Sequence, residues 1–258
     1  MRIIDLSVPL SAKCQERGKE GETTIPQIEY VGHLDGGKQM AKIFDCSPND
    51  FPTPGCGWAF EILTVGTHNG THVDAPWHYS PTSDGKKSAT IDEMPLEYCF
   101  GDGVVMRFTD KKAGEKIDIE DMKRELDRMH YTLKPGDIVY VNTGWDKYWG
   151  TSDYFYDKPG VTRDATLWLI DQGIHLMGTD SSGWDRSFKE QAKDFKRTGD
   201  RNYLWEGHFA GAIKPYYQIE KLANLDQLPD FGFKTCCIPI KIEKAGAAWA
   251  RPVAFLED

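Results

Sequence analysis

Residues 66–80 read GTHNGTHVDAPWHYS, and this stretch decides how the fold and the chemistry of the chain are interpreted. It holds three of the seven histidines, His68, His72 and His78, together with Asp74. Neutral imidazole and carboxylate are ligand types that zinc, manganese and iron bind in proteins. Three protein ligands leave positions open for water, as in a catalytic site rather than a structural one. The stretch predicts a catalytic metal site; the alternative is a turn held only by hydrogen bonds.

The small residues of this stretch indicate its conformation. Gly70 allows a positive φ or close backbone packing, and Pro76 stiffens the chain just after Asp74. The preceding residues 60–65 (FEILTV) alternate in the manner of a strand. We therefore expect a rigid loop that follows a strand, and not a long helix.

The composition of the whole sequence indicates a folded protein. The chain has 258 residues, with 31 basic and 40 acidic side chains, which give a formal charge of −9. With 40% hydrophobic and 28% charged residues, it is neither a disordered chain nor a membrane protein. No run approaches the roughly 18–20 apolar residues of a membrane helix, and the N-terminus lacks the features of a signal peptide. The acidic balance, without a basic stripe, argues against nucleic acid as a partner. We expect a cytoplasmic protein.

The six cysteines are scattered, without a C-x-x-C pair, and Cys236 and Cys237 are sequence neighbours with poor geometry for bridging each other. This pattern favours free thiols in a reducing compartment over a disulfide framework or a zinc ribbon.

The remaining patterns predict one α/β domain over residues 1–258 with a mixed β-sheet flanked by helices. A long irregular insertion is expected at about residues 12–58, which are rich in Gly, Pro, Asp and Asn. Thr162 is the expected N-cap of a helix that stops before Gly173. The predicted strands cover 2–8, 60–65, 103–108, 138–141, 174–177 and 235–242; the predicted helices cover 119–129, 162–172 and a short one at 219–223; and 188–197 is expected to be a charged surface segment.

The pattern H-x-G-T-H-x-D-x-P-x-H over residues 68–78 resembles the signature of the cyclase family of metal-dependent hydrolases, which includes bacterial kynurenine formamidases and isatin hydrolases. The opening IDLSVPL (residues 4–10) is similar to the start of that family. The resemblance implies a swivelling β/β/α-like fold. It also implies that His68, His72 and Asp74 are metal ligands and that His78 is the acid–base catalyst.

The same resemblance implies a second pair of ligands, because the formamidases carry a further His and, twelve residues later, a Glu. His208 and Glu220 have that spacing here. The implied cofactor is Mn²⁺ or Zn²⁺, with one or two ions per subunit, and the implied assembly is a homodimer or homotetramer.

A mechanism follows from the residue types themselves. A divalent ion lowers the pKa of water and polarises a carbonyl oxygen. His78, which titrates near neutrality when unperturbed, would move the proton from that water to a leaving nitrogen. The alternative role for His78 is to orient a ligand from outside the coordination shell. G-x-S-x-G, P-loop and G-x-G-x-x-G motifs are absent from the sequence, and Asp180 and Ser181 are expected at a structural position or the pocket edge.

Aromatic residues near the motif suggest the substrate. Trp77 immediately precedes His78, Trp58 is a second candidate for a pocket that holds a flat ring, and Phe44 and Phe51 are further ones. An isatin-like cyclic amide is favoured because of the long insertion, with N-formylkynurenine as the main alternative. The same residues would also suit a lactone hydrolase, a cyclase or lyase that acts through an enolate, or a non-catalytic metal-binding protein.

Overall fold

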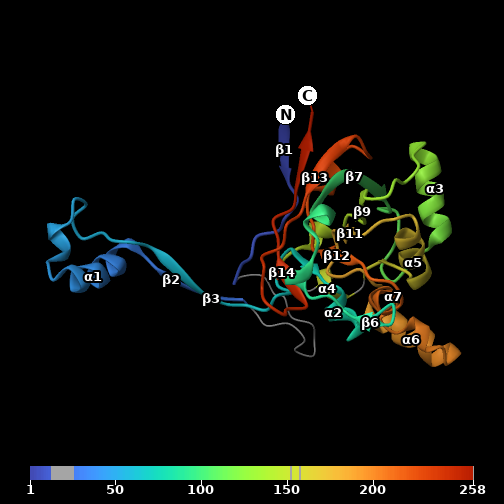
Figure 1. The fold of residues 1–258 in the computed structure, drawn as a ribbon, viewed down its shortest axis with the longest axis horizontal. Coiled ribbons are helices and arrows are strands. Elements are labelled where there is room, and N and C mark those ends of the chain that lie inside the picture. The colour runs from blue at the N-terminus through green and yellow to red at the C-terminus, as the bar shows by residue number, and fades with distance from the viewer. Residues whose placement is uncertain (13–25, 152, 157, 258) are drawn as a thin grey trace.

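The computed structural model describes residues 1–12, 26–151, 153–156 and 158–257, and its body is built on a mixed β-sheet (Figure 1). The four central strands run parallel, and the pairs toward both edges are antiparallel. Helices flank this sheet, so the predicted fold class is confirmed. Among the described residues nine strands form the sheet, in the order β1 (Arg2–Asp5), β15 (Val253–Leu256), β13 (Phe233–Cys236), β7 (Phe100–Arg107), β9 (Ile138–Asn142), β11 (Leu176–Thr179), β12 (Tyr217–Glu220), β4 (His72–Asp74) and β14 (Ala247–Trp249).

The core lies on both faces of this sheet. Successive side chains of a strand point to opposite faces. Val104 accordingly joins one buried cluster and Val105 the other, and Val139 and Tyr140 divide in the same way. A strand that is buried on both faces appears in the sequence as a continuous apolar run. This explains why the apolar runs at 103–108 and 138–141 correctly predict strands.

The main helices of the body follow their sequence signals closely. Asp118 caps α3 (Ile119–Met129) by accepting a hydrogen bond from the backbone N–H of Asp121 at 3.0 Å. Thr162 caps α5 (Arg163–Asp171), as predicted: its hydroxyl oxygen accepts a hydrogen bond from the backbone N–H of Ala165. The other helices are α2 (Pro76–Tyr79), α4 (Asp153–Tyr156), α6 (Phe188–Thr198), which the sequence suggests only as a charged segment, and α7 (Glu206–Ile213).

An arm projects from the body, with its helix at the end far from the main sheet (Figure 1). Its stem is a two-stranded ribbon of β2 (Gln27–Val31) and β3 (Phe60–Thr64), and its tip contains α1 (His33–Phe44). The prediction of an irregular 12–58 insertion is therefore wrong for residues 27–31 and 33–44, while residues 13–25 lie outside the described part. The predicted strand at 60–65 exists, but it pairs with β2 and stays outside the main sheet.

Two further predictions need correction. Residues 219–223 do not form a helix: Ile219 lies in β12, buried between β11 and β4, and the chain turns at Lys221, whose φ is 60°. The sheet neighbours on both sides outweigh the weak helical pattern of this short segment. The strand predicted at 235–242 ends at Cys236, shortly before Pro239.

Smaller features complete the description. Two-stranded pairs form between β8 (Lys116–Ile117) and β10 (Gly160–Val161) and between β5 (Thr82–Ser83) and β6 (Lys86–Lys87). Cysteines 46, 56, 99, 236 and 237 are free thiols, as expected, and Cys14 lies outside the described residues. Across the described part of the chain, every helix is too short or too polar to cross a bilayer.

Candidate metal centre

The pairing of β4 with β12 brings two distant parts of the sequence together. His72 lies directly opposite Glu220 in the register, and Asp74 lies opposite Gln218. Residues two apart on a strand share a face, so these four side chains all project from the same side of the sheet. The register alone therefore places His72, Asp74 and Glu220 in one cluster.

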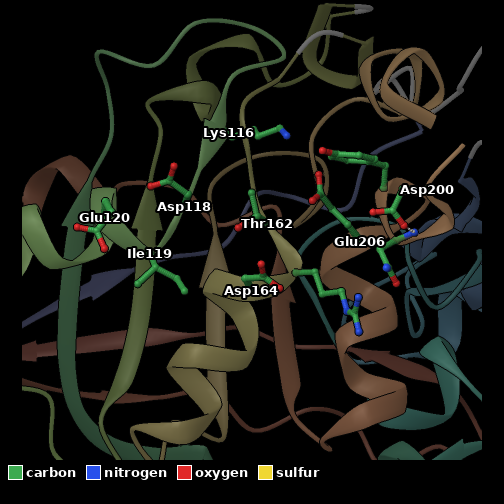
Figure 2. A pocket seen from close by; sticks show the side chains of 11 residues that line it. Lys116, Asp118, Ile119, Glu120, Thr162, Asp164, Asp200 and Glu206 are labelled. Carbon is green, nitrogen blue, oxygen red and sulfur yellow. Dashed lines mark hydrogen bonds between the residues drawn. The ribbon is translucent and has the colours of Figure 1, made fainter. Parts of the chain in front are cut away.

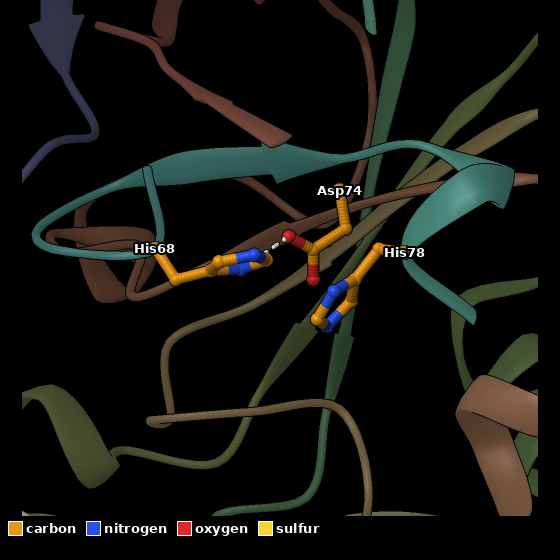
Figure 3. A group of neighbouring side chains, drawn as sticks. All are labelled: His68, Asp74 and His78. Carbon is orange, nitrogen blue, oxygen red and sulfur yellow. Dashed lines mark ion pairs between the residues drawn. The ribbon is translucent and has the colours of Figure 1, made fainter. Parts of the chain in front are cut away.

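Three predicted ligand atoms converge at the edge of this cluster. His68 Nδ1 lies 2.9 Å from Asp74 Oδ1, His72 Nε2 lies 3.2 Å from the same oxygen, and the two nitrogens are 3.3 Å apart. Figure 3 shows His68 reaching Asp74 from its loop, with His78 on the other side of the carboxylate. Ligand atoms that share one ion at about 2.0–2.2 Å are separated by roughly 3 to 3.5 Å. The spacing therefore suits a single divalent ion.

The state of Asp74 tests this fit. Its Oδ1 atom is buried and accepts no hydrogen bond within the described chain, although two imidazole nitrogens face it. Burial raises the pKa of Asp74, but the neighbouring His72 and His68 outweigh burial and hold that pKa well below its ordinary value. A buried, ionised oxygen without a hydrogen-bond donor is costly unless a cation compensates it. The residues present therefore fit a metal ion.

The Gly and Thr positions of the motif hold the predicted ligands in place. Gly70 has φ 62°, and its carbonyl oxygen lies 2.9 Å from His72 Nδ1. This contact directs the opposite nitrogen, Nε2, toward Asp74. Thr71 donates a hydrogen bond to the carbonyl of Lys221 at 2.6 Å, and the Lys221 ammonium group donates to the carbonyl of His68. The loop and the end of β12 are thus tied together on both sides of the ligands.

The second predicted pair of ligands lies beside the first group. Glu220 Oε2 is 3.6 Å from His72 Nε2, and Glu220 Oε1 is 3.4 Å from His208 Nε2. His208 Nε2 is also 3.9 Å from Asp74 Oδ2. Two ligand groups of suitable size share Asp74: one adds His68 and His78, and the other adds His72 and Glu220. The structure thus brings all five predicted ligands together, and it places His208 at the margin of the cluster.

The sequence patterns do not identify two polar residues at this margin, Asp185 and Gln218. The Asp185 carboxylate accepts a hydrogen bond from His208 Nδ1, which leaves Nε2 facing the cluster. Burial lowers the pKa of His208, but Asp185 and Glu220 outweigh it and raise that pKa to about 10. The Gln218 amide lies 2.8 Å from both His208 Nε2 and Glu220 Oε1. Assigning 217–220 as a strand would have placed Gln218 on the face of Glu220, whereas no local signal marks Asp185.

His78 lies in the short helix α2, which Pro76 begins. Its ring centroid is 4.1 Å from that of His68 and 5.6 Å from that of His208. Burial lowers the pKa of His78 to about 4, with the neighbouring histidines acting in the same direction and Asp74 opposing them. The imidazole is therefore uncharged near neutral pH and can accept a proton.

The predicted substrate-binding aromatics divide into two places. Trp77 lies on α2 next to His78 and is 41% exposed. Phe44 ends α1 and packs edge-on against Phe51, while Trp58 follows on the returning segment, so all three belong to the arm (Figure 1). Of these predicted aromatics, only Trp77 lies beside the histidines of its own chain.

Asp180 is fully buried, and its hydrogen bonds indicate a structural role, one of the two positions expected for it. Its carboxylate accepts hydrogen bonds from the backbone and hydroxyl of Thr143, the amide of Asn142 and the backbone of Gly144. It thereby fixes the turn after β9. Ser181 donates to the carbonyl of Gly183 at 2.8 Å.

A separate cavity of about 510 Å³ opens between α3, α5 and the start of α7 (Figure 2). It contains none of the motif histidines. Several of its charged groups already have partners: Glu206 binds Arg186, and the Lys116 ammonium lies 4.6 Å from the ring centroid of Tyr203. The lining residues are Lys116, Asp118, Ile119, Glu120, Thr162, Arg163, Asp164, Asp200, Asn202, Tyr203 and Glu206.

Known proteins are similar to this chain in sequence and in fold. A family model described as "Putative cyclase" matches residues 4–186, more than half of the chain. The isatin hydrolase of Roseibium aggregatum is 24% identical over 231 residues, covering 86% of this chain and 84% of the relative. The kynurenine formamidase of Erythrobacter litoralis is 24% identical over 191 residues, covering 74% of each. The structure of isatin hydrolase A from Labrenzia aggregata matches with a TM-score of 0.77 at 24% identity, covering 100% of this chain and 94% of that one. With the motif intact and the family model matched over residues 4–186, this chain belongs to the cyclase family.

Proposed function

We propose that this protein, a metal-dependent hydrolase of the cyclase family, opens the C–N bond of a flat cyclic amide of the isatin type. The observation that carries the proposal is the convergence of His68, His72 and Asp74 around one buried oxygen without a hydrogen-bond donor. We assign the site to Mn²⁺ or Zn²⁺, since both bind imidazole and carboxylate. The two ligand groups that share Asp74 support one or two ions per chain.

The side chains around the ion have separate tasks. A divalent ion at such a site lowers the pKa of a water molecule and polarises the carbonyl oxygen of a bound amide. His78 is uncharged near neutral pH, so its imidazole accepts the proton of the attacking water and returns it to the departing nitrogen. Asp185 holds the His208 ring in one orientation, with Nε2 toward the cluster.

The substrate class is supported by the relatives and by Trp77 beside the cluster. The isatin hydrolase relative matches a larger share of this chain than the formamidase from Erythrobacter litoralis does. A related isatin hydrolase structure holds the product analogue thioisatinate. Trp77 offers a half-exposed ring next to His78, against which a flat aryl group can stack.

Arylformamide hydrolysis is the second candidate, because several kynurenine formamidases match about three quarters of this chain. Both reactions break an amide next to an aromatic ring. The bond that breaks lies inside a ring in isatin and outside a ring in N-formylkynurenine. The metal cluster itself does not distinguish these two bonds.

The test is a turnover assay with isatin and N-formylkynurenine on protein loaded with Mn²⁺ or Zn²⁺, carried out in ¹⁸O-labelled water. We expect kcat/KM for isatin to exceed that for N-formylkynurenine by about tenfold or more, with one labelled oxygen in the acid product. The reverse ranking would make the protein a formamidase. A product without label would favour a cyclase or lyase, and loaded protein that turns over no aryl amide, lactam or lactone would favour a metal-binding protein.

A further inference from the structure

Lys158, between α4 and β10, is a buried charged side chain that has no task in the proposed mechanism. It is 6% exposed, and lysines are almost never buried to this degree without partners. Its ammonium group donates hydrogen bonds to the backbone carbonyls of Gly183 and Asp185. Burial lowers the pKa of Lys158 to about 8, and the charges of Glu220 and Asp185 oppose that shift. The group is therefore largely protonated at neutral pH and fixes the segment that carries the two carbonyls.

This segment, residues 183–186, contacts both ligands of the second predicted pair. The backbone N–H of Trp184 donates a hydrogen bond to Glu220 Oε1 at 3.2 Å. The carboxylate of Asp185 accepts a hydrogen bond from His208 Nδ1. The 183–186 segment thus holds Glu220 through a main-chain donor and His208 through a side-chain acceptor. A displacement of this one segment would move both predicted ligands.

The 183–186 segment is itself held at several points. The backbone N–H of Val161 donates to the carbonyl of Trp184 at 2.9 Å, and the Gln191 amide donates to the carbonyl of Arg186 at 2.6 Å. Each of these contacts reaches a single residue of the segment. Lys158 binds two carbonyls, one on either side of Trp184. The position of the Trp184 N–H relative to the neighbouring carboxylate therefore depends on Lys158.

Lys158 also lies close to the predicted ligands in space. A Cβ atom on Gly183 would lie 3.3 Å from Lys158 Nζ and 3.4 Å from Glu220 Oε1, so both groups flank the same point of the backbone. Asp185 and Glu220 face the two nitrogens of His208 from opposite sides. Two carboxylates in a buried site repel each other unless positive charge lies near them. The ammonium group supplies such a charge without occupying the metal position.

We propose that Lys158 is a positioning residue of the metal centre, because it holds the 183–186 segment where that segment orients Glu220 and His208. The proposal rests on the metal site of the proposed function, but it does not depend on the substrate. Loss of a residue that orients ligands typically lowers metal affinity by about 10–100-fold. The charge of Lys158 alone would have the opposite effect, because an ammonium group repels a nearby divalent ion. Removal of the side chain therefore separates the two effects by their sign.

The first test is the metal affinity of Lys158→Met, measured by competition with a chelator. Methionine has a similar length but no hydrogen-bond donor, and we expect Mn²⁺ or Zn²⁺ to bind about 10–100-fold more weakly than in wild type. The control is Lys111→Met, which removes an ammonium group that pairs with Asp121 on α3 and is 18% exposed. This control is expected to lower the Tm but to keep the wild-type metal affinity. Unchanged or tighter metal binding by Lys158→Met would overturn the proposal.

The second test follows the hydrogen bond between His208 and Asp185 by NMR of protein labelled with ¹⁵N-histidine. The His208 Nδ1–H resonance is identified in metal-free protein by its loss in Asp185→Asn. We expect this resonance to be present in wild type and in Lys111→Met, and to be shifted or lost in Lys158→Met. An identical resonance in Lys158→Met and wild type would show that Lys158 does not position the pair.

The third test needs no variant. Native protein is treated with acetic anhydride, and the modified lysines are identified by mass spectrometry. Lys158 is expected to resist acetylation in metal-free as well as metal-loaded protein, whereas Lys193 and Lys244, with side chains 74% and 83% exposed, are expected to react. Acetylation of Lys158 in metal-free protein at the rate of Lys193 would overturn the proposal. None of the tests uses turnover, so a protein that shows the expected dependence on Lys158 but fails to open isatin would refute the proposed function alone.

Discussion

At the scale of single residues, one oxygen organises the site: Asp74 Oδ1, which faces His68 Nδ1 at 2.9 Å and His72 Nε2 at 3.2 Å. Some of its neighbours have side chains that can bind an ion, and others hold those side chains in position. His78 stands apart, because its ring lies against His68 while burial keeps it uncharged. The proton-transfer role assigned to His78 and the ligand role assigned to His68 and His72 therefore make different predictions.

Replacement of His78 tests its role in proton transfer. We expect His78→Ala to reduce kcat by about 10²–10⁴-fold, because general acid–base catalysis contributes that much. The bound metal, measured by mass spectrometry of the purified protein, is expected to stay at the wild-type level. His175→Ala, whose ring stacks on Tyr98 away from the site, is the control with the same change. Loss of metal together with activity would show that His78 is a ligand.

Asp185 tests the orientation of His208. The carboxylate accepts from His208 Nδ1 and from the backbone N–H of Gly207. Loss of such a partner typically lowers metal affinity by about 10–100-fold. We expect Asp185→Asn to show a loss in that range by competition with a chelator. An unchanged metal affinity would place His208 outside the ligand set.

At the scale of elements, Asp230 joins a strand to a helix. It accepts from Arg107 Nε of β7 at 2.7 Å and from Arg128 Nη2 of α3 at 2.8 Å. Burial raises the pKa of Asp230, but these two hydrogen bonds outweigh it and lower that pKa below its ordinary value of 3.8. The stabilisation is therefore present above this ordinary value and is lost as the pH falls through the lowered pKa.

The pH dependence of unfolding checks this connection. We expect Asp230→Asn to lower the free energy of unfolding by about 1 kcal/mol at pH 7, since the groups are partly exposed. The difference from wild type should shrink as the pH falls below about 4. Denaturant unfolding of both proteins across this range measures it. If the difference in free energy of unfolding between the two proteins does not change with pH, the charge of Asp230 does not contribute to stability.

The elements also show what the sequence can predict. Helix α3 has a capping residue and apolar residues at helical spacing, both local signals, and its bounds are predicted correctly. The last two residues of strand β12, Ile219 and Glu220, are mistaken for the start of a helix, because their conformation depends on hydrogen bonds to β11 and β4, which lie far away in the sequence. Helix α1 is missed because its glycines indicate a loop, whereas in the fold they allow close packing against residues 55–58.

The same distinction applies to the site. The ligands of the 68–78 motif are recognisable because they lie within eleven residues. Gln218 and Lys221 reach the cluster only through the pairing of β12 with β4, and Asp185 reaches it through α7. Contacts between residues this far apart, 23 positions for Asp185 and His208 and more than a hundred for β12 and β4, leave no periodic trace in one sequence.

At the scale of the whole molecule, an ion bound by the proposed ligands would link the loop at 66–71, the β4–β12 pair and, through His208, helix α7. A ligand that binds only the folded state stabilises it by about 2.7 kcal/mol at one hundred times its Kd. We therefore expect the Tm to fall when the metal is removed with a chelator and to recover when Mn²⁺ or Zn²⁺ is added. Asp74→Asn, which removes the shared charge, should abolish this recovery. A wild-type Tm that does not change when the metal is removed would contradict a stabilising role for the ion.

The most direct test of the central claim is a titration of chelated, metal-free protein with Mn²⁺ or Zn²⁺ while isatin opening is followed. If the ion held by His68, His72 and Asp74 supports the reaction, turnover should rise in proportion to the bound metal. It should then saturate at one or two ions per chain, and the Asp74→Asn variant should stay inactive throughout. Turnover by metal-free protein at the rate of the loaded protein would contradict the account.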